Sequence, residues 1–118
     1  MKKDVLDFVV AQTHDLLKAP SACPEVKAAA NAWLKAIGTS TEAAETKKYL
    51  QEIEEDITTI DGLIAFAGSA AGAQVFGADV AKQVLAHALD IKAKGAKYCD
   101  CPACTACLAI LNKKAEML

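Results

Sequence analysis

The chain has 118 residues, the size of one domain with a single hydrophobic core. Its formal net charge of -2 and its aromatic content of 5% exclude the basic, aromatic-lined surfaces that bind nucleic acid. Apolar residues make up 53% of the chain, so the sequence predicts one aliphatic, alanine-rich domain over residues 1–118.

The first two predicted helices lie in the first third of the chain. One covers residues 4–18, where apolar side chains recur every three or four positions. The next begins at Pro24. Proline suits the first position of a helix, because the N–H that it lacks would have no partner within the helix there. It contains Trp33, the expected aromatic anchor of the core, and ends at Gly38, which suits the left-handed conformation after a helix.

A third helix is expected to begin at Thr39, which has with Glu42 the spacing of a capping box. Its acidic residues 52–56 are predicted to form a solvated face. The core stripe has steps of three or four residues and consists of Leu50, Ile53, Ile57, Ile60 and Ile64. Since this stripe continues past Gly62, the sequence predicts either one kinked helix or a new helix that starts near Thr59.

The segment of residues 62–78 carries no charge, but it is too short and too rich in glycine for a membrane span. Its glycines, among them Gly68 and Gly72, predict short helical pieces or close helix contacts, and the pattern favours neither. A further helix is predicted over residues 78–93 and is closed by Gly95. The expected core stripe of this helix consists of Val80, Val84, His87 and Ile91.

The last predicted helix opens at Pro102 and is followed by a frayed tail over residues 113–118. No segment alternates apolar and polar residues as a strand does. The sequence therefore predicts an all-α fold, a compact bundle of about five to seven helices with a cysteine-rich knuckle before the last helix. Near the start, Asp4 and Asp7 interrupt any secretory apolar stretch, so the expected compartment is the cytoplasm.

Four of the five cysteines lie within nine residues of one another, at Cys99, Cys101, Cys104 and Cys107. The fifth, Cys23, is far away in sequence and precedes a proline, as Cys101 does. In a reducing compartment, clustered cysteines more often bind metal or exchange electrons than form structural disulfides. A helix that begins at Pro102 would also favour thiolates near its positive N-terminal end.

The leading interpretation of these cysteines is a structural zinc site, because zinc binds four thiolate or imidazole ligands in a tetrahedron. The four clustered cysteines supply one ligand set. A second set replaces one of them with Cys23, which would tie the last helix to the start of the second. His14 and His87 are substitute ligands.

The same cysteines permit two redox alternatives. Cys101, Cys104 and Cys107 have the spacing of three ferredoxin ligands, and Cys23-Pro24 resembles the fourth, which would give an iron–sulfur cluster. Cys101-Pro-Ala-Cys104 resembles the active-site turn of thioredoxin-like proteins. Both motifs normally occur in a different structural context. Ferredoxin ligands lie in a loop around the cluster, and the thioredoxin-like turn follows a β-strand. Here a helix is predicted from Pro102 onward, and no strand is predicted.

Several stretches together resemble a family of small all-helical bacterial proteins that are often labelled heat-shock or chaperone proteins. The matching stretches are Ala19-Pro-Ser21 followed by Cys23, residues 42–49, residues 54–57, and the tail Lys97-Tyr-Cys-Asp-Cys-Pro-Ala-Cys104. The resemblance implies an all-helical fold with a cysteine-bearing tail. Chaperone activity of the large ATP-dependent kind is not implied, because none of the nucleotide-binding motifs is present.

The sequence thus favours a binding or scaffolding role over catalysis. It contains no phosphate-binding glycine loop, nucleophile elbow or paired catalytic carboxylates. The expected partner is another protein of unknown identity. A homo-oligomer is also compatible with the sequence, because Gly68 and Gly72 would permit close helix packing between subunits.

Overall fold

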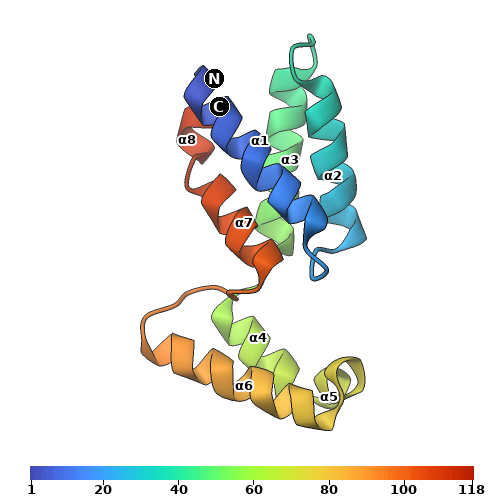
Figure 1. Ribbon diagram of the computed structural model, residues 1–118, viewed down its shortest axis with the longest axis vertical. Coiled ribbons are helices and arrows are strands. Elements are labelled where there is room, and N and C mark those ends of the chain that lie inside the picture. Colours follow the sequence, from blue (N-terminus) through green and yellow to red (C-terminus); the bar gives the residue numbers. More distant parts are fainter. The chain divides into compact units, whose positions relative to one another are not determined.

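The computed structural model describes residues 1–118, which form eight α-helices and no strand (Figure 1). The helices are α1 (Lys3–Lys18), α2 (Pro24–Ala36), α3 (Glu42–Asp56), α4 (Ile60–Ala67), α5 (Ala70–Phe76), α6 (Ala78–Ala93), α7 (Pro102–Leu111) and α8 (Lys114–Met117). The predicted all-α class is confirmed. None of the helices combines the length and the apolar character that a membrane span requires.

The chain divides into two compact units. Unit 1 comprises residues 1–57 and 100–118 and holds α1, α2, α3, α7 and α8. Unit 2 comprises residues 58–99 and holds α4, α5 and α6. The single domain over residues 1–118 stays a prediction.

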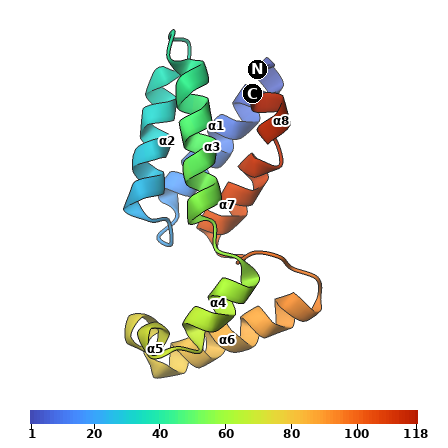
Figure 2. The same ribbon diagram turned by 180° about the vertical axis from the view of Figure 1, so that it is seen from behind.

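The core of unit 1 is built around Trp33, which is fully buried as the sequence predicts. Within this unit α2 and α3 lie side by side and antiparallel, and α1 packs against α7 (Figure 2). The ring of Trp33 stacks on Tyr49 of α3 at a centroid distance of 5.3 Å, and its Nε1 donates to Oγ1 of Thr46 at 3.0 Å. The Tyr49 hydroxyl is hydrogen-bonded to Oγ1 of Thr13 on α1 at 2.9 Å. These two buried hydrogen bonds and the stacked rings therefore join α1, α2 and α3.

The turn between α2 and α3 confirms one prediction and overturns another. Gly38 has a φ of +80°, the left-handed conformation expected after α2. The capping box is wrong, since α3 begins only at Glu42 and Thr41 is its N-cap. The hydroxyl of Thr39 donates instead to the carbonyl of Ala36 at 2.6 Å. Thr39 thus serves the end of α2, because the carbonyls of its last turn also need partners.

The long apolar stripe of the third predicted helix is divided between the two units. The chain leaves α3 after Asp56 and starts α4 at Ile60, which confirms the predicted restart near Thr59. Thr59 is the N-cap of α4, and its Oγ1 accepts a hydrogen bond from the Gly62 N–H at 3.0 Å. Ile53 is buried in the core of unit 1, and Ile60 is buried in the core of unit 2.

The glycines of unit 2 produce both alternatives that the sequence allows, short helical pieces and a close contact between helices. They delimit short helices, because Gly68 is the C-cap that follows α4 and Gly77, with its positive φ, separates α5 from α6. Gly72 also allows a close contact, since a Cβ at this position would lie 2.0 Å from the carbonyl oxygen of Phe66. Only glycine fits there without a shift of the backbone.

Two expectations about the later helices are wrong. Half of the predicted stripe on α6 is confirmed, because Val84 and Ile91 pack against the core of unit 2. The other half is wrong, because Val80 is 46% exposed and His87 is exposed, and the buried residues of α6 are Ala81 and Ala88. The small side chains of Ala81 and Ala88 thus take the buried places that the sequence assigns to Val80 and His87. The tail is not frayed but ends in the short α8, which is why there is one helix more than expected. Met117 fixes α8 by its burial in the core of unit 1.

Candidate metal centre

Cys99 lies at the end of a short extended segment. The adjacent Tyr98 forms an isolated antiparallel bridge with Thr59, and the Cys99 N–H donates to the carbonyl of Thr58 at 2.9 Å. Its side chain is half-buried and packs against the core that contains Ile60 and Leu63. These backbone hydrogen bonds therefore fix the position of the Cys99 backbone relative to the residues that precede α4.

Cys101 is the N-cap of α7, as expected for a helix that opens at Pro102. Its Sγ accepts a hydrogen bond from the Cys104 N–H at 3.3 Å, the role that a serine or aspartate oxygen has in other caps. The Thr105 hydroxyl donates to the carbonyl of Asp100 at 3.2 Å and steadies the approach to the helix. The N–H donor and the positive end of the helix both favour a thiolate at Cys101.

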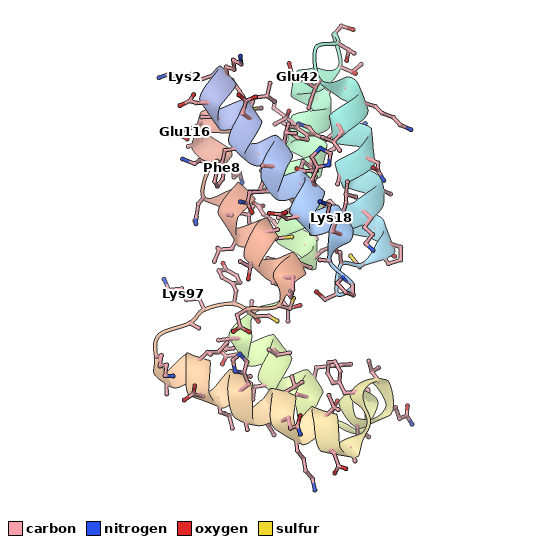
Figure 3. All side chains as sticks on the ribbon, viewed as in Figure 1. Lys2, Phe8, Lys18, Glu42, Lys97 and Glu116 are labelled. Carbon is pink, nitrogen blue, oxygen red and sulfur yellow. The ribbon has the colours of Figure 1, made fainter.

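Cys99, Cys101 and Cys104, here called the cysteine trio, bring their sulfur atoms within 4.8 Å of one another. All three lie in six consecutive residues, so their proximity follows from the local path of the chain. Sulfur atoms on a tetrahedral zinc ion are about 3.8 Å apart when the Zn–S bonds are about 2.3 Å long. The trio could therefore hold a metal ion with little rearrangement. Figure 3 shows sulfur atoms around the N-terminal end of α7.

The other predicted ligands lie outside this group. Cys107 is only 3% exposed and belongs to the core of unit 1, and Cys23 is the half-buried N-cap of α2 beside the same core. Neither His14 nor His87 belongs to the group. The ferredoxin-like set, which needs Cys107 and Cys23 together with Cys101 and Cys104, is not brought together as one group of donors. No disulfide joins any of the five cysteines.

The burial of the Asp56 side chain differs from the solvated face that the sequence predicts for residues 52–56. Its Oδ2 atom is buried and has no hydrogen-bond partner. Burial raises the pKa of the Cys23 thiol, and a hydrogen bond to Asp56 and its negative charge act in the same direction, against a backbone hydrogen bond with Val26. The position of Asp56, three residues after the buried Ile53, was the available signal, since residues three apart share one side of a helix.

Burial, together with the smaller effects of negative charge at Cys101, Asp56 and Cys23, raises the pKa of the Cys107 thiol to about 12. Burial also raises the pKa of Tyr49. The Cys107 thiol and the Tyr49 hydroxyl are neutral when protonated. Because their pKa values are higher in the folded than in the unfolded state, they lose their protons at a higher pH in the folded protein. Their contribution to stability is therefore complete below the unfolded pKa values and is lost as the pH rises.

We expect the free energy of unfolding of the metal-free protein to fall above about pH 9, by about 1.4 kcal/mol per pH unit for each group that ionises only on unfolding. Cys107→Ala should flatten this fall from about pH 9, and Tyr49→Phe should flatten it only above about pH 10. Urea unfolding midpoints between neutral and alkaline pH measure the effect. Equal slopes in the wild type and in both variants would contradict the assignment.

Comparison with known proteins gives no match: no protein-family model fits the chain, and no curated protein or solved structure is significantly similar to it.

Proposed function

We propose that the cysteine trio binds one zinc ion, and that this ion fastens the segment around Asp100 to the first turn of α7. The proximity of the three sulfur atoms, all within 4.8 Å of one another, is the observation that carries the proposal. The ion would be structural, in a small protein whose role is binding or scaffolding rather than catalysis. Apolar side chains that unit 2 leaves exposed, such as Val75 and Leu89, support a role in binding a partner.

The chemistry of the donors supports zinc. Thiolates are soft ligands that select zinc, copper(I) or iron–sulfur clusters over magnesium and calcium. An ion such as Zn²⁺ needs deprotonated thiols, and the N-terminal end of α7 lowers the free energy of thiolates at Cys101 and Cys104. Cys104 is buried, whereas Cys99 and Cys101 are half-buried, so the ion would be shielded on one side and reachable on the other.

The proposal predicts which cysteines zinc protects from alkylation. In protein treated with one equivalent of zinc, Cys99, Cys101 and Cys104 should react far more slowly with iodoacetamide than in chelator-treated protein. The half-buried Cys23 is the internal control, because its rate should not change. Mass spectrometry of the digested protein measures each rate, and protection of Cys23 without protection of the trio would contradict the proposed ligands.

One observation favours a second candidate, a dithiol redox centre at Cys101 and Cys104. Cys101 is at a helix N-cap with a hydrogen bond from the Cys104 N–H, and the two sulfur atoms belong to the same close group. Such a pair is suited to thiol–disulfide exchange. Under this alternative the protein, isolated without oxygen, would contain no metal, and Cys101 would be the fastest-reacting thiol.

A further inference from the structure

Cys101 and Cys104 have the geometry of a pair that can form a disulfide as well as that of two zinc ligands. We infer that this pair is a modification site, at which a hydroperoxide oxidises the two thiolates to a disulfide and the protein releases its zinc. The inference rests on the proposed function, because it describes the regulation of the ion held by the cysteine trio. Oxidation would open the metal centre, and reduction would close it again.

The start of α7 directs the sulfur of Cys101 toward Cys104. Cys101 is the N-cap, and its Sγ accepts a hydrogen bond from the Cys104 N–H at 3.3 Å. The two sulfur atoms lie within 4.8 Å of one another. Residues three apart in a helix have Cα atoms about 5 Å apart, and disulfides join Cα atoms that are about 4.4–6.8 Å apart. The disulfide therefore needs a rotation of side chains and no displacement of the helix.

Exposure determines the order of the two chemical steps, because Cys101 is half-buried and Cys104 is buried. The hydroperoxide first meets the Cys101 thiolate. An S–O bond forms, the O–O bond breaks, and the other oxygen leaves and takes a proton from water, so that Cys101 becomes a sulfenic acid. The Cys104 thiolate then attacks the Cys101 sulfur, the S–S bond forms, the S–O bond breaks, and the departing hydroxide is protonated to water. The two thiolates lose two electrons in total, and the hydroperoxide accepts them.

Oxidation of this pair removes two of the three thiolates of the trio and leaves Cys99 alone. Zinc is bound by thiolates and not by disulfide sulfurs, so the ion is released. Cys107 and Cys23 are near enough to Cys101 to interact with it through their charges, but both lie outside the group of close sulfur atoms. Cys107 is also only 3% exposed in the core of unit 1. Cys104 is therefore the cysteine placed to close the disulfide, and thiol–disulfide exchange with a dithiol would restore both ligands.

Zinc-loaded protein treated with hydrogen peroxide beside a chromophoric chelator provides the test. One zinc ion should be released for each disulfide formed, and peptide mapping by mass spectrometry should place that disulfide between Cys101 and Cys104. A dithiol reductant should restore zinc binding. Zinc that stays on the oxidised protein would overturn the inference, and so would a disulfide that joins either residue to another cysteine. A protein that binds no zinc before peroxide is added would instead contradict the proposed function.

Two variants identify the cysteine that closes the disulfide. Cys23→Ser is the matched control and should release zinc at the wild-type rate, because Cys23 lies outside the trio. In metal-free Cys104→Ser the sulfenic acid at Cys101 loses its partner, so dimedone should label Cys101 there and not in the metal-free wild type. An unlabelled Cys101 in this variant would show that another cysteine closes the disulfide and would overturn the inference. If Cys104→Ser does not fold, the peptide map of the wild type decides.

Discussion

Replacement of Cys104 by serine is expected to lower the affinity for zinc by more than about 100-fold. Loss of a group that only orients a metal ligand costs 10- to 100-fold in affinity, and Cys104 is proposed to be a ligand itself. It is also the buried member of the trio, and its N–H donates to the sulfur of Cys101. A competition titration with a chromophoric chelator measures the change.

The loss of affinity should appear as a loss of stability only when zinc is present. With free zinc at about 1,000 times the dissociation constant, the wild type gains about 4 kcal/mol, and Cys104→Ser should lose most of this gain. Cys23→Ser is the matched control, because Cys23 is half-buried and lies outside the trio. An equal loss of zinc affinity in Cys23→Ser would show that the ligand set is wrong.

Replacement of Trp33 by alanine is expected to destabilise the protein by about 3–5 kcal/mol, the usual effect of removing a large, fully buried aromatic side chain. The variant loses the stacking on Tyr49 and leaves Oγ1 of Thr46 without its indole donor. Because the contacts of Trp33 lie inside unit 1, the effect should not depend on zinc. Urea unfolding followed by circular dichroism measures it.

Asn31→Ala is the control for this prediction, since Asn31 is exposed on the same helix. Its effect should stay within about 0.5 kcal/mol, as for most surface substitutions. A Trp33→Ala variant that unfolds at the same urea concentration as Asn31→Ala would contradict the central place of Trp33 in unit 1.

The boundaries of most helices could be predicted because local chemistry determines them. Pro24 and Pro102 open helices, and Gly38 follows one with a positive φ, as backbone sterics require. The division of the stripe from Leu50 to Ile64 between two cores could not be predicted, since a period of three to four residues shows which side is buried but not against which neighbour.

The location of the candidate site could be predicted from the sequence, but the set of cysteines that form it could not. Cys104 and Cys107 share one side of a helix, so periodicity groups them. In the structure the extended segment brings Cys99 to the start of α7, while Cys107, about 4.5 Å further along the axis, belongs to the core. The path of a loop and the direction of the core are tertiary properties, and residue spacing alone does not reveal them.

The most direct test of the metal centre is elemental analysis, together with a visible spectrum, of protein purified without oxygen. The proposal predicts about one zinc per chain without visible absorbance, and no retained zinc in Cys104→Ser. Iron with acid-labile sulfide and a brown colour would contradict zinc and indicate a cluster. A well-folded wild type that contains no metal, and binds none when zinc is added, would contradict the metal centre and leave the Cys101–Cys104 dithiol as the better account.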